Sequence, residues 1–337
     1  MKFGPVPIGA AEGALLAHSA QLPSGKLPKG TVLTQAHLGE MAAQGQREVI
    51  VAQLGAHDIS ENTAAARLAQ ALVPAPEPAG LRVTEPFTGR VNLVAEASGI
   101  VEINTRAIEA LNSVDPMITL ATVPQYARVV PGMLVGTVKI ISYGVAAAAL
   151  HRAAEAGRAA LRVRQAAHSS AGLVLSEITE ADARLRAKSV DAIETRLAQL
   201  GMSLAETRVV AHRARDIGQA LSEVAGDMAL LLTASATSDP HDVGPSGLRE
   251  AGGQVERFGM PVDPGNLLFL GAIGARTVIG LPGCARSPAL NGADWVLERV
   301  ACGVPVTGAD IAAMGVGGLL KEIPSRPQPR RQKRRDD

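Results

Sequence analysis

Apolar runs of strand length alternate with helical segments from about residue 165 to residue 303, and this alternation constrains the fold more than any other feature of the chain. The run Met228–Leu232 has the length of a buried strand and stops abruptly in a loop of small and hydroxylated residues, 233–242. A second apolar run, residues 277–280, leads into the turn Leu281-Pro-Gly-Cys-Ala-Arg-Ser-Pro288. Strands joined by helical crossovers pair in parallel. The expected fold class is therefore α/β, with a mainly parallel three-layer sheet.

Further elements extend this pattern, with strands expected at 172–176 and 207–210 and helices at 182–200, 216–224 and 291–302. The first helix carries Val190, Ile193 and Leu197 on one face and ends at Gly201. In open α/β sheets, ligands bind beyond the carboxyl ends of the strands. The polar loops that follow the apolar strands are therefore the candidate site.

Three short motifs occur in these loops in a fixed order: Ala234-Ser235-Ala236-Thr237-Ser238-Asp239-Pro240-His241-Asp242, then Pro264-Gly265-Asn266-Leu267, then Leu281-Pro282-Gly283-Cys284-Ala285. Their order and spacing resemble the Gly-Gly-x-Ser-x-Gly-x-x-Asp loop, the Pro-Gly-Lys-Pro turn and the Leu-Pro-Gly-Asn-Pro segment of the molybdopterin-binding domain of molybdenum cofactor biosynthesis proteins. The resemblance covers about residues 165–303. More loosely, residues 1–145 resemble the leading region of bacterial molybdopterin-binding proteins that are sometimes joined to a cytidylyltransferase domain. The resemblance over residues 165–303 implies the molybdopterin-binding α/β fold.

The first loop supplies hydroxyl groups from Ser235, Thr237 and Ser238 beside an expected helix N-terminus, a combination that favours anions such as phosphate. By the resemblance, Asp242 falls on the functional aspartate of the family and is the candidate catalytic residue. Asp239 and Asp242 could together assist a Mg²⁺ ion, which takes carboxylate oxygens. The alternative is that both aspartates are only turn and N-cap residues.

The other two motifs predict tight turns, at which glycine permits a positive φ or a close approach of the backbone to a ligand. Their candidate cofactor-binding residues are Pro264, Gly265, Asn266, Pro282, Gly283, Arg286 and Ser287. Arg286 suits bidentate contact with phosphate. Turn chemistry alone also explains the glycines. Cys284 could lie beside a thiol-rich ligand or be an inert buried cysteine, and His241 could be a proton donor or simply solvated.

The chain departs from the resembled motifs at several positions. Ala234-Ser235 replaces the Gly-Gly pair, Asn266 replaces the lysine and Cys284 replaces the asparagine. The resemblance implies a molybdopterin-binding protein that acts in or near molybdenum insertion, similar to molybdopterin molybdenumtransferases. The departures favour the alternative, a non-catalytic carrier or regulator of molybdopterin or the molybdenum cofactor. An unrelated nucleotide-binding protein on the same architecture is a third hypothesis.

The remaining sequence predicts further regions around the α/β domain. Residues 1–73 are expected to form a small mixed unit, followed by the proline-rich stretch 74–78 and a strand-rich region at 81–145. Within that region, a turn near Ser98 between two apolar runs predicts a hairpin. The molybdopterin-binding domain is expected at 146–303, including an Ala-rich helix at 145–162, and a C-terminal extension at 304–337.

Composition excludes several functional classes. Hydrophobic residues make up 47% and aromatic residues only 2%, so the core is aliphatic, and no apolar run reaches the ~18–20 residues of a membrane span. The N-terminus lacks the pattern of a secretory signal and there are two cysteines, so we expect a cytoplasmic protein that does not contact the membrane.

Charge is concentrated at the C-terminus. Residues 326–337 hold six Lys or Arg and two Asp, a charge of +4, so the rest of the chain carries about −3 of the net +1. This Pro/Gln/Arg-rich tail is expected to be disordered. The body is neither basic nor aromatic, so nucleic acid is not an expected partner. The resemblance implies molybdopterin, other cofactor-biosynthesis proteins or molybdoenzymes, and a second copy of the chain as partners.

Overall fold

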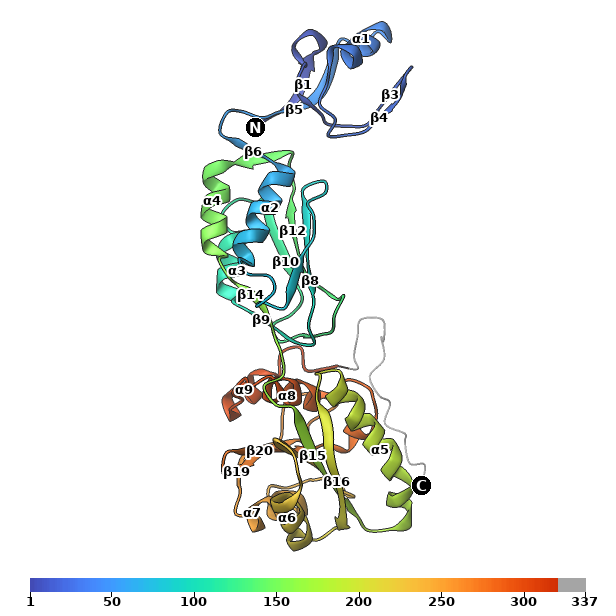
Figure 1. Cartoon of the computed structure of the whole chain (residues 1–337), viewed down its shortest axis with the longest axis vertical. Coiled ribbons are helices and arrows are strands. Elements are labelled where there is room, and N and C mark those ends of the chain that lie inside the picture. The colour runs from blue at the N-terminus through green and yellow to red at the C-terminus, as the bar shows by residue number, and fades with distance from the viewer. Residues whose placement is uncertain (321–337) are drawn as a thin grey trace, which may run out of the picture. The chain divides into compact units, whose positions relative to one another are not determined.

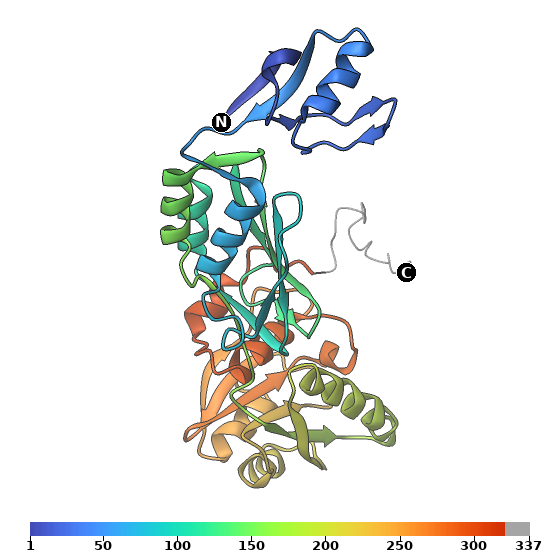
Figure 2. The same ribbon diagram turned by 45° about the horizontal axis from the view of Figure 1, so that its top comes forward.

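The computed structural model describes residues 1–320, apart from the side chains of residues 180–182, and the predicted disordered tail lies outside this range. Backbone contacts divide the chain into two compact units. The first comprises residues 1–97 and 101–164, and the second comprises residues 98–100 and the chain from 165 onward. Figures 1 and 2 show the elements of both units.

The first part of unit 1 is a small antiparallel sheet with one helix. Its strands are β1 (Lys2–Pro7), β5 (Glu48–Gln53) and β2 (Leu15–Leu16), in the order β1-β5-β2, followed by the pair β3 (Ala20–Leu22) and β4 (Gly25–Leu27). A short 3₁₀ turn, η1 (Ile8–Ala10), follows β1. The helix α1 (Gln35–Ala43) begins at Thr34, whose hydroxyl accepts from the amide of His37. Leu38 and Met41 bury one face of the helix in this small core.

The larger part of unit 1 packs three helices on antiparallel strands. The first sheet has the strand order β10 (Ile118–Thr122), β12 (Leu134–Ile140), β8 (Arg90–Ala95) and β7 (Leu81–Val83). The second has the order β11 (Arg128–Val129), β9 (Gly99–Ile103) and β14 (Leu161–Arg164). The third pairs β13 (Gly144–Ala146) with β6 (Asp58–Ser60). The helices are α2 (Glu61–Leu72), α3 (Thr105–Asn112) and α4 (Ala147–Ala156). One continuous aliphatic core joins them.

Two sequence predictions differ from this arrangement. Strands β8 and β9 lie in different sheets, so the hairpin predicted at Ser98 is wrong. Strand β9 and the second half of β8 are buried almost throughout, and such apolar runs do not reveal which strand they pair with. The Ala-rich helix α4, which we grouped with the molybdopterin-binding domain, packs against α2 and α3 within unit 1.

Unit 2 is built on one six-stranded sheet. Its strand order is β16 (Ser203–Ala211), β15 (Ser170–Glu177), β17 (Met228–Leu232), β20 (Arg276–Leu281), β19 (Phe269–Ile273) and β18 (Gln254–Phe258). The first four strands pair in parallel, and β19 runs antiparallel to both of its neighbours. The sheet is therefore mixed, and the predicted parallel pairing is found among its four strands β16, β15, β17 and β20.

Strands β18 and β19 are not among the elements expected from the sequence, and in β19 the apolar run is interrupted by Gly271. A Cβ atom at Gly271 would lie 2.3 Å from the carbonyl oxygen of Gln254 on β18. Glycine is therefore required by the close approach of the neighbouring strand rather than by a turn.

Helices cover the sheet of unit 2. They are α5 (Glu180–Ala198), α6 (Ala214–Glu223), α7 (Val243–Glu250), α8 (Gly292–Ala301) and α9 (Gly308–Ala313), with the 3₁₀ turn η2 (Gly283–Arg286). Helices α6 and α7 pack side by side over Val174, Leu231 and Val278, and α5 packs on β15 and β16 (Figures 1 and 2). All five residues of β17 are buried, as the uninterrupted apolar run predicts.

Within residues 1–320, no helix is both long and apolar enough to cross a membrane.

Candidate functional site

The loops that carry the three motifs leave the sheet at a single edge. Strands β15, β16, β17, β20 and β18 all run in the same direction, so their carboxyl ends share one edge of the sheet. From β15 the chain crosses to β16 on one side, and then returns to β17 on the other side. The chain therefore reverses its direction of travel across the sheet between β15 and β17, where ligands bind in open α/β sheets.

Polar side chains from three strands meet at this reversal point. Ser176 lies near the end of β15, His212 follows β16, and Ser235 follows β17. Ser176 Oγ lies 2.8 Å from His212 Nδ1, and Nε2 of the same ring lies 2.8 Å from Ser235 Oγ. Ser176 Oγ also accepts from the amide of Ala234 at 3.1 Å. We refer to Ser176, His212, Thr233, Ser235, Thr237 and Arg286 as the carboxyl-edge cluster.

Hydroxyl groups also stabilise the loop after β17 from within. Thr233 Oγ1 donates to the carbonyl oxygen of Ser235 at 2.8 Å and lies 3.3 Å from Thr237 Oγ1. Thr233 and Thr237 are both buried. Of the predicted hydroxyl ligands, Thr237 therefore shapes the loop, whereas Ser235 and Ser238 are exposed.

Arg286 joins the loop after β20 to the loop after β17. Its guanidinium donates to the carbonyl oxygen of Thr233 at 2.9 Å and to Ser189 Oγ on α5 at 2.8 Å. These two bonds fix the arginine against the cluster.

The two aspartates of the first motif hold backbone amides. Asp242 is the N-cap of α7, where its carboxylate accepts from Val243 N at 2.7 Å and from Ser238 N at 3.0 Å. Asp239 accepts from the amide of His241 at 2.7 Å, which is a local turn bond. Asp239 and His241 are exposed. The sequence left two roles open for Asp242, a functional role and an N-cap role. The structure shows that it has the N-cap role.

The second motif lies at the same edge of the sheet but farther along it. Strand β18 is three strands from β17, which corresponds to about 14 Å at the usual spacing. Gly265 has a φ of +139°, and a Cβ there would lie 2.6 Å from Gly292 N, so glycine is required. Pro264 accepts from that same amide through its carbonyl oxygen, at 2.8 Å. The turn therefore packs against the start of α8. The Asn266 side chain stays exposed.

The third motif contains a glycine that the fold does not require. A Cβ atom at Gly283 would meet nothing within 4 Å, and this residue is exposed. Pro282 is the N-cap residue of η2. Cys284 is partly buried and not in a disulfide. The Gly283 position thus leaves open the close approach to a ligand that the sequence predicts.

A buried arginine holds the segment after η2 in place. The Nε atom of Arg196, on α5, lies 2.6 Å from Asp294 Oδ1. Its other nitrogens donate to the carbonyl oxygens of Ala192, Ala285, Ser287 and Ala289 at 2.7–3.3 Å. Ser287, predicted as a ligand residue, accepts in this clamp through its carbonyl oxygen, and its hydroxyl accepts from Ala289 N at 3.3 Å. Both charges of the pair are buried, which makes the clamp a rigid support.

No motif in the sequence points to His212, Arg196 or Asp294, and Ser176 enters the predictions only as the last residue of the strand expected at 172–176. Ser176 and His212 both lie at the carboxyl end of a strand, so the position of each residue was the available signal. Arg196 and Asp294 are 98 residues apart, and the sequence contains no signal for their pairing.

Among the described residues, no group of three or more His, Cys, Asp or Glu side chains could hold a metal ion. Asp239 and Asp242 therefore do not form a metal site by themselves. Mg²⁺ commonly binds through one or two carboxylates together with phosphate oxygens of a substrate. A Mg²⁺ ion at this loop would need those ligand oxygens.

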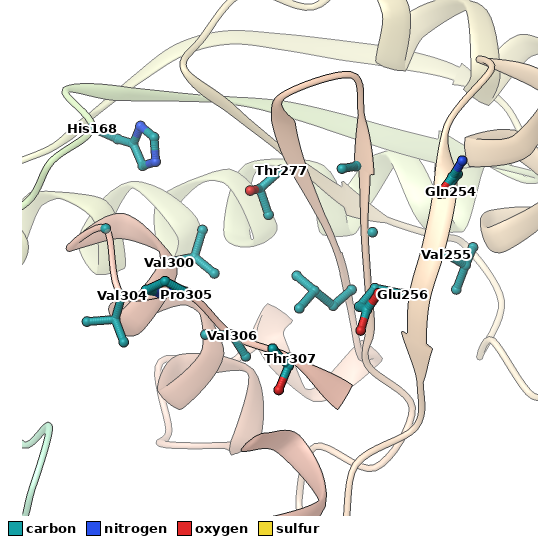
Figure 3. A pocket seen from close by; sticks show the side chains of 14 residues that line it. His168, Gln254, Val255, Glu256, Thr277, Val300, Val304, Pro305, Val306 and Thr307 are labelled. Carbon is teal, nitrogen blue, oxygen red and sulfur yellow. The ribbon is translucent and has the colours of Figure 1, made fainter. Parts of the chain in front are cut away.

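A hollow of about 560 Å³ lies elsewhere in unit 2, near the amino-terminal ends of β18 and β20 (Figure 3). Val300, Val304 and Val306 line one side of it, and Gln254 and Glu256 on β18 line another. Glu256 accepts from the amide of Gly308 at 3.3 Å. His168, Thr277 and Thr307 also line it. We place the candidate site at the carboxyl-edge cluster instead, because its polar side chains are hydrogen-bonded to one another where the chain reverses across the sheet.

Comparison with known proteins gives little further information. No protein-family model matches this chain, and no curated protein sequence matches it. Among solved structures, a molybdopterin biosynthesis MoeA protein from Pyrococcus horikosii matches with a TM-score of 0.29 and 11% identity, over 92% of this chain and 75% of that chain. A likeness at this level carries no argument about the site.

Proposed function

We propose that this chain binds molybdopterin at the carboxyl-edge cluster and acts in molybdenum cofactor biosynthesis, in or near molybdenum insertion. The observation that carries the proposal is the meeting of Ser176, His212 and Ser235 at the point between β15 and β17 where the chain reverses across the sheet. The three motifs that resemble those of molybdopterin-binding domains follow strands whose carboxyl ends share this edge.

The chemistry of the cluster suits a ligand with a phosphate and a pterin. Ser235 and Ser238 offer exposed hydroxyl groups in the loop that leads into α7, and a hydroxyl group can donate to a phosphate oxygen. His212 is partly exposed, and its two ring nitrogens lie within hydrogen-bonding distance of the Ser176 and Ser235 hydroxyl groups. A pterin edge is rich in donors and acceptors, and the amides and carbonyl oxygens of the loops after β17 and β20 can meet it.

A non-catalytic carrier is the second candidate, and the state of Asp242 favours it. Both of its carboxylate oxygens accept backbone amides, so the residue has a structural task that does not require turnover. Asn266 and Cys284 stand where the resembled motifs have lysine and asparagine. Both candidates share the ligand and differ in whether the protein converts it.

A fluorescence titration of the full chain with molybdopterin, with and without Mg²⁺, tests the shared claim. We expect binding to the wild type and a loss of about tenfold, or about 1.4 kcal/mol, for Asp242→Asn. Asp191→Asn, an exposed aspartate on α5, is the matched control and should bind as the wild type does. The absence of wild-type binding under both conditions would refute the proposal.

Turnover separates the two candidates. If the chain acts in metal insertion, purified protein consumes ATP or inserts molybdate when molybdopterin is present. If the chain is a carrier, it binds molybdopterin with the affinity found in the titration but consumes no ATP and inserts no molybdate.

A further inference from the structure

The buried hydroxyl of Ser176 determines how the protons of the cluster are arranged. Ser176 is 1% exposed, so its proton needs a partner within the protein. Its oxygen has two described neighbours, the amide of Ala234 and the Nδ1 atom of His212. An amide can only donate, so Ser176 accepts from Ala234. The His212 Nδ1 atom, 2.8 Å away, is then the group that can accept the hydroxyl proton.

This arrangement selects one tautomer of the neutral His212 ring. Because Nδ1 accepts, the ring proton lies on Nε2, and Nε2 donates to Ser235 Oγ at 2.8 Å. Ser235 Oγ then accepts on its inner side, which leaves its own proton free to be donated outward. Ser235 is exposed, so that proton can reach a ligand.

The same arrangement argues against a nucleophilic role for Ser235. A histidine that activates a serine must accept the serine proton, here through Nε2. That would place the ring proton on Nδ1 and would leave the buried Ser176 proton without this acceptor. The hydrogen bonds from Ser176 through His212 to Ser235 therefore serve ligand binding rather than covalent catalysis.

We propose that Ser176 and His212 are positioning residues that preset Ser235 as a hydrogen-bond donor to an anionic oxygen of the ligand, of the phosphate class. The identity of the ligand rests on the proposed function, whereas the tautomer and the direction of donation do not.

Histidine-selective ¹⁵N NMR of the full chain at pH 8.5, where an ordinary imidazole is neutral, tests the tautomer directly. His212→Gln identifies the resonances of this ring. We expect a proton on Nε2 and an unprotonated Nδ1 in the wild type, and a mixture of tautomers in Ser176→Ala. A proton fixed on Nδ1 in the wild type would overturn the inference.

A double-mutant cycle tests whether Ser176 acts through Ser235, with inorganic phosphate and molybdopterin as separate probes. We expect Ser176→Ala and Ser235→Ala each to weaken binding about fivefold, and the double variant to bind as Ser235→Ala does. Additive losses would show that Ser176 acts through packing and would overturn the inference. Ser222→Ala on α6, whose hydroxyl donates to Gly218, is the control and should not alter binding.

The two probes distinguish this inference from the proposed function. If the cycle shows coupling with phosphate and the chain does not bind molybdopterin, the proposed function fails and the positioning role stands. If the wild type binds neither probe, the donor role of Ser235 is wrong.

Discussion

Ser176 lies in β15, whereas His212 and Ser235 lie in the loops after β16 and β17, and the sheet brings these three residues within hydrogen-bonding distance. Ser235 could be predicted, because it lies in a hydroxyl-rich loop directly after a fully apolar strand. His212 could not be distinguished from an ordinary surface histidine. Its partners become evident only when β15 is placed between β16 and β17. Strand order therefore supplied what the local sequence could not.

The two motif glycines should respond differently to substitution. Gly265→Ala forces a Cβ atom to within 2.6 Å of Gly292 N at a φ of +139°, so we expect the free energy of unfolding to fall by about 1–3 kcal/mol. Gly283→Ala meets nothing within 4 Å and should leave stability unchanged. Urea denaturation of the two variants checks this, and equal losses would contradict the account. If a ligand approaches Gly283 closely, that variant should lose affinity alone.

The clamp made by Arg196 illustrates how helices position the loops at the carboxyl edge. Helix α5 was predicted to within a few residues, and its buried face contributed to that prediction. The ion pair to Asp294 on α8 was not predicted, because charged residues in a helical pattern usually face solvent. Breaking a buried pair leaves one charge without compensation, which is costly.

Arg196→Met should therefore lower the free energy of unfolding by about 3–5 kcal/mol and loosen the segment from Ala285 to Ala289. Arg186→Met, on the same helix, removes an exposed pair with Glu177 and should change stability little. Thermal unfolding of both variants measures the contrast. Similar small effects in the two would show that the buried clamp is not a support.

Asp227 ties the chain before β15 to the start of β17 and should give unit 2 a pH-dependent component of stability. The amide and then the hydroxyl of Ser169, followed by the amide of Ser170, donate to its carboxylate and hold the pKa of Asp227 below its ordinary value. A lowered pKa adds stability above about pH 4, and this stability is lost as the pH falls through the folded value.

Asp227→Asn should therefore be less stable than the wild type at pH 7, and the difference should shrink as the pH falls below about 4. Urea midpoints of both proteins across pH 3–7 measure this. A difference that is constant over the whole range would indicate that the charge of Asp227 plays no part.

The strands with long apolar runs were predicted well, and those with mixed sequences were not. Strand β17 matches its predicted bounds, because five consecutive apolar residues can be buried on both faces. The sequence pattern did not predict β19, whose apolar run is interrupted by Gly271, and it paired β8 with β9, which lie in different sheets. In each case the deciding contact is with a strand far along the chain, which local patterns do not encode.

The two units have separate aliphatic cores, and unit 1 has a further small core around Leu38 and Met41, so we expect at least two unfolding transitions. The one tryptophan, Trp295, lies in unit 2, and both tyrosines, Tyr126 and Tyr143, lie in unit 1. Leu231→Ala should lower the free energy of the tryptophan-detected unfolding transition by about 2–5 kcal/mol and leave that of the tyrosine-detected transition unchanged. A common shift of both signals would mean that the units unfold as one.

The homo-oligomer and the partner enzymes remain predictions. The carboxyl-edge cluster gives no information about the surfaces that would bind a second copy of the chain or a partner enzyme. The ligand and its place on the sheet are the claims on which the functional account depends.

Hydrogen–deuterium exchange of the full chain, with and without molybdopterin, tests these claims most directly. The account predicts slower exchange in residues 233–242 and 282–291, and no change in residues 254–256 and 303–307 around the hollow of Figure 3. Protection at the hollow without protection at the carboxyl edge would contradict the assignment of the site. Unchanged exchange throughout the chain at saturating molybdopterin would contradict the function.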